Sequence, residues 1–432
     1  MGPAIAAAIS LRSYLLVTAL SGSQHTVRLI FRDIDLDHTW DIDTLPWDTF
    51  QRVQKRPTFR SHVTSLAPEL LKAVTPYAEA VLSQTLAAEH RKVHVRSATA
   101  FLYLFLSLGS RDGPGFVYTL RSTIPIGAGL GSSASVCVCL SAALLLQTRG
   151  VVRPDPSHPP ADQDQQVQTI NEWAFVGELC IHGDPSGVDN TVSSGGHAVV
   201  FKRTDTKSAV TRIDNFPKLR LLLVDTKQPR STAAQLEKVK SLRTAHPAMT
   251  ETLLDGIGET VTCALNVISN DGFAGVGGGG VGGGFPDGLE RLGALVRINH
   301  GLLNSMGVSH PRLERIRELV DYAGIGWTKL TGAGGGGCAM TVFRSHNEDE
   351  NVRSLKQILA EEGFQTYETM LGAEGVGVLW PAVTHHGTQG DGAQEINQKM
   401  FEDALGPQEI EDVAGMGVRA IKGSWKFWHS AI

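Results

Sequence analysis

Apolar and polar residues alternate in two stretches of the first 125 residues, and this alternation predicts antiparallel strands with one face in water. The first stretch covers residues 4–34, where Leu11, Ser13 and Leu15 form one clear series. The second covers residues 116–124 and leads directly into a loop at Pro125. Residues 65–90 and 95–108, which lie between the two stretches, are predicted to be helical.

Helices follow this second strand closely. Residues 132–147 predict one long helix, and residues 168–181 predict another. Residues 151–166, between them, are rich in Pro, Asp and Gln and are typical of a surface loop. Asp184 followed by Pro185 predicts an N-cap with proline at the first helical position, so a further helix is expected to begin there.

Beyond this point strands and helices mix, and the pattern places a domain boundary near residue 215. Strands are expected at 197–202 and 219–224. The predicted helices of the second half are 232–244, 247–270, 287–305 and 310–323, and the predicted strands are near Trp327, at 339–343 and at 376–380. We therefore predict domains at 1–215 and 216–384, and an extension at 385–432 whose aromatic end, residues 425–428, docks on the protein.

The amino-acid composition limits the classes of protein to which this chain can belong. The 432 residues include 42% hydrophobic and 19% charged residues, which is ordinary for a folded globular protein. The net charge of −5 gives no overall reason to expect nucleic acid or a membrane as a partner. The N-terminal residues lack the early basic charge of a signal peptide, and no apolar run approaches the roughly 20 residues of a spanning helix. Cytoplasm is therefore the expected location, with a small molecule as partner.

The five cysteines are expected to be reduced and structural. They are scattered along the chain and mostly have apolar neighbours. Cys137 and Cys139 are two residues apart on a predicted helix, where side chains do not share a face, so a zinc site is a poor interpretation.

A glycine-rich element, Pro125-Ile-Gly-Ala-Gly-Leu-Gly-Ser-Ser-Ala134, joins a predicted strand to a predicted helix. Its glycines allow a tight bend, and the free N–H groups at the start of the helix favour an anion. Ser132 and Ser133 can coordinate magnesium or bind a phosphate oxygen. The pattern indicates a phosphate site, although a glycine turn with a serine N-cap is the simpler alternative.

Two other nucleotide-binding motifs do not fit. The sequence contains no GxxxxGK[ST], so an ordinary P-loop is excluded. A dinucleotide fold would require an acidic residue about 20 residues after the glycines, within a parallel sheet, and neither is predicted here.

Carboxylates follow in the run from Glu178 to Asn190, which contains His182-Gly-Asp-Pro-Ser-Gly-Val-Asp-Asn190. Phosphoryl transfer needs acidic oxygens for Mg²⁺ and a carboxylate that orients the attacking hydroxyl. Glu178 and Asp189 could converge across the turn at Gly183. Both could equally be surface acids.

A third glycine element, Lys329-Leu-Thr-Gly-Ala-Gly-Gly-Gly-Gly-Cys-Ala-Met340, lies between apolar stretches. Four consecutive glycines allow close approach to another backbone or to a ligand. The alternative is a loop that only packs on the first glycine element. A separate glycine run at 275–284 has no Ser, Thr or Lys and is expected to be a flexible insertion.

Together the three elements resemble the GHMP kinase superfamily, named for galactokinase, homoserine kinase, mevalonate kinase and phosphomevalonate kinase. PIGAGLGSSAS, IHGDPSGVDN and KLTGAGGGGCAM are most similar to the mevalonate kinases of fungi, in the right order and spacing over about residues 2–380. The resemblance implies an α+β fold of two domains, the N-terminal one like a domain of a ribosomal protein and the C-terminal one ferredoxin-like. It also implies a homodimer.

The resemblance further implies an enzyme that uses ATP and Mg²⁺ to phosphorylate the 5-hydroxyl of mevalonate in isoprenoid and sterol biosynthesis. The ATP phosphates would be bound by Gly127, Ala128, Gly129, Leu130, Gly131, Ser132, Ser133 and Ala134. Ser133 and Glu178 would hold Mg²⁺, and Asp189 would be the base. The implied substrate-binding residues are Arg230, Thr232, Gly332, Ala333 and Gly334; for Arg230 a solvated charge at a helix start is the alternative.

The sequence departs from the family at its start. The family's first motif, PGKxxxxGEHxVxxGxPA, supplies a lysine near the phosphates, whereas this chain opens with Met-Gly-Pro-Ala-Ile and has no lysine before Lys55. Loss of that charge would weaken catalysis. Two alternatives to a mevalonate kinase therefore stay open: another GHMP kinase such as phosphomevalonate kinase, or a catalytically silent nucleotide sensor.

Overall fold

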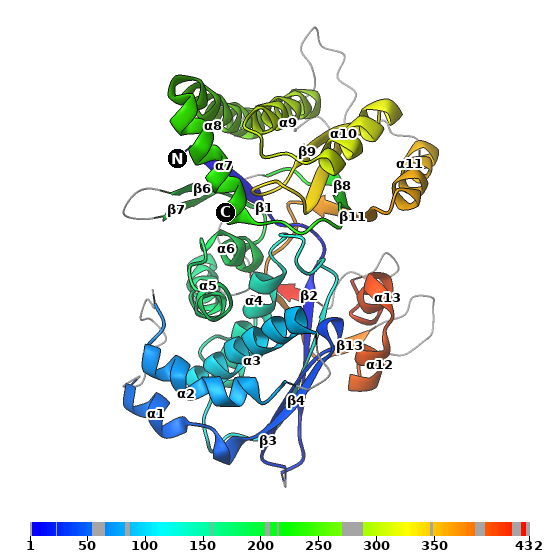
Figure 1. Ribbon diagram of the computed structural model, residues 1–432. Coiled ribbons are helices and arrows are strands. Elements are labelled where there is room, and N and C mark those ends of the chain that lie inside the picture. Colours follow the sequence, from blue (N-terminus) through cyan, green and yellow to red (C-terminus); the bar gives the residue numbers. More distant parts are fainter. Residues whose placement is uncertain are drawn as a thin grey trace. The chain divides into compact units, whose positions relative to one another are not determined.

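A computed structural model describes most of the chain: residues 2–22, 24–53, 65–82, 87–155, 157, 159–203, 208–213, 216–269, 288–345, 349–384, 394–416 and 425–428. The described residues form two compact units, each built from separate segments (Figure 1). Unit 1 takes the residues up to Ser10, Pro125–Leu130 and His197–Ala373. Unit 2 takes Leu11–Ile124, Gly131–Gly196 and the residues from Glu374 onward. The boundaries at 215 and 384 stay a prediction, and the glycine run at 275–284 lies outside the described residues.

Unit 2 contains a four-stranded sheet in the order β2-β5-β3-β4. The strands are β2 (Ser13–Ala19), β3 (Thr26–Phe31), β4 (Leu36–Asp41) and β5 (Phe116–Ser122). The β2–β5 and β3–β4 pairs are antiparallel, as the alternation predicted, but β3 and β5 are parallel. A parallel pair needs a long connection, and the helices between β4 and β5 provide it.

Helices bury the apolar face of this sheet. They are α1 (Trp47–Val53), α2 (Pro68–Glu79), α3 (Ala88–Leu108), α4 (Ser132–Gln147) and α5 (Pro160–His182), while α6 (Val188–Gly195) packs on α4 and α5. Helix α4 is apolar on nearly all sides, and such a helix belongs inside a core. Phe101, Leu104 and Tyr118 are completely buried in the cluster that α3 and α4 share with the sheet.

Two helix starts differ from the sequence prediction. Helix α5 begins at Pro160, within the stretch predicted to be a loop, because proline is compatible with the first turn of a helix. Helix α6 begins at Val188 rather than at Asp184. Gly183 and Gly187 both have positive φ angles, 77° and 79°, so the chain turns between them and Gly187 takes the N-cap position.

The C-terminal residues belong to unit 2. Strand β15 (Trp425–Phe427) pairs with β12 (Gly377–Leu379), and β13 (Val383–Thr384) pairs with β14 (Gln394–Glu395). Two short helices, α12 (Gln398–Asp403) and α13 (Gly406–Val413), precede β15. Trp428 is 2% exposed, and its indole N–H donates to the Val152 carbonyl at 3.1 Å. The prediction that the aromatic end docks on the protein is confirmed.

Unit 1 contains an antiparallel sheet in the order β11-β8-β10-β9. The strands are β8 (Leu219–Asp225), β9 (Gly326–Leu330), β10 (Cys338–Phe343) and β11 (Gln365–Leu371). Numbered along the chain, the order is 4-1-3-2, and helices cross between the first two and the last two strands. This βαββαβ connectivity confirms the ferredoxin-like prediction.

The helices of unit 1 are α7 (Thr232–Ala245), α8 (Pro247–Ser269), α9 (Gly288–Ser305), α10 (Pro311–Ala323) and α11 (Asp349–Glu361). The core joins the sheet to α10 and α11 through Leu222, Val224, Leu313, Ile316 and Leu355. A second sheet, β1-β6-β7, has β1 (Ala4–Ala7), β6 (Ala198–Arg203) and β7 (Ser208–Arg212). In neither unit does a described helix combine the length and apolar character needed to cross a membrane.

Candidate functional site

The first glycine loop, residues 126–131, has the backbone of an anion-binding concavity. Gly127, Gly129 and Gly131 have φ angles of 78°, 74° and 76°, and the residues between them do not have positive φ. Left-handed residues at alternate positions of a turn can direct successive N–H groups toward one side. Side chains rarely adopt these angles, so glycine is required at each of the three positions.

Arg230 lies against this loop in unit 1. A Cβ atom at Gly129 would be 1.5 Å from Nη2 of Arg230, and one at Gly332 would be 2.6 Å from Nη1. Nη1 also donates to the Thr331 carbonyl at 3.4 Å. The structure describes no carboxylate that pairs with Arg230. The guanidinium group is therefore a half-buried cation between two glycine loops, not a fully solvated charge at a helix start.

The third glycine element forms a loop, Thr331–Gly337, that packs on the first. A Cβ atom at Gly337 would be 3.3 Å from the Ala128 carbonyl oxygen. The hydroxyl of Thr226 donates to the Gly337 carbonyl at 2.7 Å, and the N–H of Gly335 donates to the Val308 carbonyl at 2.8 Å. The loop is thus fixed at two points by neighbouring backbone and side-chain groups.

In unit 2, helix α4 begins at Ser132 with Gly131 as its N-cap. Ser133 Oγ lies 3.0 Å from Nε2 of His182, and the same nitrogen lies 4.0 Å from Oε2 of Glu178. The Glu178 side chain is 5% exposed, and its Oε1 has no hydrogen-bond partner among the described residues. A buried oxygen without a partner is costly, which indicates that a ligand completes this cluster.

The carboxyl group of Glu178 is held partly protonated near neutral pH. Burial raises the pKa of Glu178 to about 7, and the negative charge of Asp189 adds to the rise, while a hydrogen bond from Ser133 opposes it. A cation bound at this point would reverse the shift, because it stabilises the carboxylate.

Asp189 lies beside the start of α4. A Cβ atom at Gly131 would be 3.5 Å from Cβ of Asp189 and 3.7 Å from its Cγ. Asp189 is an exposed acid in the first turn of α6, where the helix dipole favours its charge. The structure thus brings Asp189, Ser133 and Glu178 together in unit 2, as the sequence predicted.

His182 and Gln235 belong to these clusters and were missed in the sequence. His182 was interpreted only as the end of a helix, although its i,i+4 spacing from Glu178 places both on one face. Burial, and then the charge of Arg96, lower the pKa of His182, which favours a neutral ring beside Ser133. Gln235, in the first turns of α7, is 7% exposed and lies against Gly335; no sequence motif singles it out.

The predicted site residues fall into two sets. Unit 2 holds Gly131, Ser132, Ser133, Ala134, Glu178 and Asp189, and unit 1 holds Gly127, Ala128, Gly129, Leu130, Arg230, Thr232, Gly332, Ala333 and Gly334. Thr232 is exposed at the start of α7, and within the described part of the chain no hydrogen bond joins it to a glycine loop.

The protein's own groups do not form a closed metal cage. Among the described residues, no group of three or more His, Cys, Asp and Glu could hold a metal ion. The Ser133 hydroxyl and the unpartnered oxygen of Glu178 offer two oxygen ligands of the kind Mg²⁺ accepts, and Mg²⁺ usually takes its remaining ligands from water and substrate phosphates. The donor set therefore fits Mg²⁺ bound together with a nucleotide.

Two family models match the chain. Residues 94–196 match the GHMP kinases N terminal domain, which includes α4, Glu178 and Asp189. Residues 287–357 match the GHMP kinases C terminal domain, which includes the third glycine loop.

Several relatives are similar over nearly the whole chain. "Mevalonate kinase erg12" of Aspergillus fumigatus is 57% identical over 430 residues, covering 98% of this chain and 78% of the relative. "Mevalonate kinase" of Candida albicans is 38% identical, covering 99% and 94%. The human mevalonate kinase is 32% identical, covering 87% and 89%.

Solved structures share the fold. The crystal structure of L. major mevalonate kinase in complex with R-mevalonate has a TM-score of 0.59 at 20% identity, covering 87% of this chain and 91% of that one. The Methanococcus jannaschii mevalonate kinase has a TM-score of 0.57 at 17% identity, covering 86% and 92%.

Proposed function

Because the chain belongs to the mevalonate kinase family of the GHMP kinases, we propose that it transfers the γ-phosphoryl group of ATP to the 5-hydroxyl of mevalonate. The observation that carries this proposal is the cluster of Ser133, Glu178 and Asp189 around the first turn of α4, directly after a glycine loop with alternating positive φ. Phosphoryl transfer depends mainly on positioning and on charge stabilisation, and the cluster supplies groups for both.

The ATP phosphates bind along residues 127–134. Their negative charge matches the N–H groups of the glycine bend and the positive end of the α4 dipole. The hydroxyl of Ser132, at the first position of the helix, donates to a phosphate oxygen. Ala134 is completely buried and anchors this turn in the core of unit 2.

Glu178 and Ser133 would hold the magnesium ion. When bound, Mg²⁺ would neutralise charge that develops on the phosphate oxygens. Glu178 would contribute its buried carboxyl group in the charged form. The His182 ring, 3.0 Å from Ser133 Oγ, helps to orient the Ser133 hydroxyl beside Glu178.

Asp189 accepts the proton of the mevalonate hydroxyl. Asp189 is an exposed residue of α6, so its carboxylate can contact a substrate. A general base has to reach the proton it removes, and the position of Asp189 beside Gly131 places it next to the phosphate loop.

Mevalonate binds at the third glycine loop and Arg230. The guanidinium group lies against Gly129 and Gly332, has no carboxylate partner among the described residues, and matches the single carboxylate of mevalonate. The backbone of Gly332, Ala333 and Gly334 borders the substrate. Thr232, exposed beside Arg230, contributes a hydroxyl.

Membership of this family also indicates a cellular role. We propose that the product, 5-phosphomevalonate, enters isoprenoid and sterol biosynthesis, that the enzyme acts in the cytoplasm and that it forms a homodimer. The dimer is tested by light scattering of the purified protein; a mass near 46.4 kDa would show a monomer instead.

A coupled assay that measures ADP release tests the reaction. The substrates are mevalonate, mevalonate phosphate, galactose and homoserine, each with Mg-ATP. Turnover with mevalonate, and a product carrying one phosphate, is the expected result. Turnover only with mevalonate phosphate, or nucleotide binding without turnover of any of the four, would contradict the proposal.

A further inference from the structure

A buried histidine on α9 makes two hydrogen bonds that the proposed mechanism does not use. His300 is 3% exposed. The N–H of Leu330 donates to its Nδ1 at 3.2 Å, and its Nε2 lies 3.0 Å from Oε1 of Glu314. Because Nδ1 accepts, the proton of the neutral ring is on Nε2 and is donated to the Glu314 carboxylate. Burial lowers the pKa of His300, which keeps the ring neutral although Glu314 opposes the shift.

The bond to Leu330 fixes the entry to the third glycine loop. Strand β9 is at the edge of its sheet, so one side of it has no neighbouring strand. Leu330 is the last residue of β9 and directly precedes Thr331–Gly337. An edge N–H that is buried needs an acceptor, and His300 supplies it.

Glu314 is also linked to the same loop through Ser309 and the neighbouring residue Val308. It accepts a short hydrogen bond from Ser309 and another from Arg317 Nε at 3.3 Å. The residue before Ser309 is Val308, whose carbonyl accepts the N–H of Gly335 at 2.8 Å. A Cβ atom at Gly334 would be only 2.1 Å from that carbonyl oxygen, so the loop rests directly on this segment.

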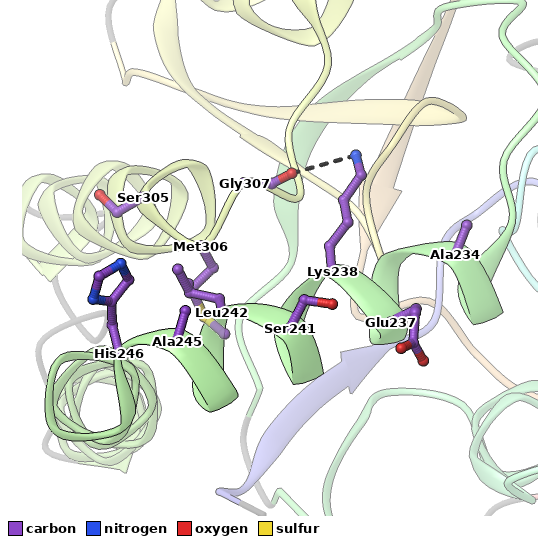
Figure 2. A pocket seen from close by; sticks show the side chains of 10 residues that line it. All are labelled: Ala234, Glu237, Lys238, Ser241, Leu242, Ala245, His246, Ser305, Met306 and Gly307. Atoms are coloured by element: carbon purple, nitrogen blue, oxygen red, sulfur yellow. Dashed lines mark hydrogen bonds between the residues drawn. The ribbon is translucent and has the colours of Figure 1, made fainter.

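The residues directly before this segment border a hollow. A hollow of about 730 Å³ lies between α7 and residues 305–307. Figure 2 shows Lys238 reaching from α7 to the Gly307 carbonyl, at 3.5 Å, along this hollow. Such a long bond from an exposed lysine fixes little. Glu314 therefore adds a side-chain anchor at Ser309 to the backbone bond that the Val308 N–H donates to the Leu303 carbonyl at 3.4 Å.

From these contacts we propose that His300 and Glu314 are positioning residues for mevalonate binding. Through Leu330 and through Ser309 they hold both the entry and the centre of the third glycine loop in one place. The inference rests on the proposed function in one respect, the assignment of that loop to mevalonate. Neither residue touches substrate, and their effect is transmitted through the backbone of the loop.

Steady-state kinetics of His300→Ala tests the proposal. The KM for mevalonate is expected to rise about tenfold or more, while the KM for ATP changes less than twofold, because a displaced loop weakens binding of the alcohol substrate alone. A purely structural role predicts a lower melting temperature with both KM values unchanged, and that result would overturn the proposal.

Two conservative variants test the two hydrogen bonds of the His300 ring one at a time. In His300→Asn the amide oxygen can still accept from Leu330, and in His300→Gln the amide nitrogen can still donate to Glu314. Each is expected to restore part of the mevalonate KM lost in His300→Ala. If His300→Ala does not fold, Glu314→Gln replaces the charged acceptor of His300 and Ser309 with a neutral amide oxygen, which weakens both bonds, and is expected to raise the same KM about threefold; no change in it would reject the proposal.

Two controls distinguish failure of this inference from failure of the site assignment. His94→Ala removes a comparable buried histidine of unit 2, 2% exposed and bonded to the Ile34 carbonyl, and is expected to lower stability without a change in either KM. Gly332→Ala alters the loop directly. If Gly332→Ala raises the mevalonate KM and the His300 variants do not, the positioning role is wrong; if none of them does, the loop does not bind mevalonate and both conclusions are wrong.

Discussion

The two sets of site residues are built from different chemical groups. In unit 2, the set around the start of α4 consists of side chains that titrate or donate, namely Glu178, Asp189, His182 and Ser133. In unit 1, the set consists mainly of loop backbone, which is left-handed at Gly127, Gly129, Gly332 and Gly334, with Arg230 as the cation that lies against both glycine loops. Only a peptide bond, between Leu130 and Gly131, separates the sets along the chain.

Because of this difference, we expect the two sets to have different roles. Side chains on helices hold protons and metal ions, because their pKa values respond to burial and to neighbouring charge. Backbone N–H groups in glycine loops bind anions without titrating, so their contribution does not change between pH 5 and 9. We therefore expect substitutions in the side-chain set to alter kcat, magnesium dependence and pH dependence, and substitutions in the backbone set to act through steric and conformational strain.

The largest expected effect comes from Asp189→Ala. Loss of a positioned general base is expected to lower kcat about 10²- to 10⁴-fold with little change in the KM for ATP. Initial-rate assays with mevalonate and Mg-ATP measure kcat and the KM for ATP. Asp184→Ala removes another exposed acid from the same turn and should stay within twofold of the parent; near-normal kcat in Asp189→Ala would reject its role as base.

Substitutions in the backbone set are also expected to have a strong effect, in this case on the free energy of unfolding, which can be measured without substrate. Gly127 and Gly129 have nearly equal φ angles, so alanine at either costs about 1–2 kcal/mol of strain. At Gly129 the new Cβ would also collide with the Arg230 guanidinium, whereas at Gly127 nothing lies within 4 Å. Gly129→Ala is therefore expected to lower the free energy of unfolding by about 1 kcal/mol or more beyond Gly127→Ala.

Chemical denaturation without nucleotide measures this pair. Equal destabilisation of the two variants would show that Arg230 does not occupy the position described here.

Glu178→Gln is expected to raise the magnesium concentration for half-maximal activity roughly 10- to 100-fold, because a carboxylate ligand becomes a neutral amide. Activity is titrated against free Mg²⁺ at fixed ATP. Glu172→Gln, on the exposed face of the same helix and bonded to Gln168, is the matched control. An unchanged magnesium requirement in Glu178→Gln would exclude Glu178 as a ligand.

The smallest expected effect is a pH dependence of stability in the metal-free protein. The pKa of Glu178 is raised to about 7 in the folded state, from a usual value of 4.5, so between these pH values the folded state binds more protons than the unfolded state. Its contribution to stability is therefore present below about pH 4.5 and is lost as the pH rises through about 7.

Glu178→Gln cannot titrate, so it should lack this loss. Relative to the parent, we expect the variant to gain on the order of 1–2 kcal/mol in free energy of unfolding between pH 5 and pH 8, measured by denaturation in the presence of a chelator. Parallel pH profiles of parent and variant would show that Glu178 is not desolvated.

Local patterns were enough to determine much of this protein. The helix Ser132–Gln147 was predicted from its first residue to about its last, because a glycine-rich turn, two serines and a largely apolar run specify where a buried helix starts and roughly how far it extends. The glycine elements also marked positions where the backbone has positive φ angles, since such angles favour glycine and leave a visible signature in the sequence.

Only the tertiary structure decided which distant groups meet. No pattern in the sequence places Arg230 against Gly129, Gln235 against Gly335 or His300 against Leu330. The parallel pairing of β3 with β5 and the start of α6 at Val188 likewise depended on long-range packing and on a glycine turn. Sequence periodicity reports which face of an element is apolar, whereas the partner of a buried polar group is fixed by the packing of whole elements, and that information is not local.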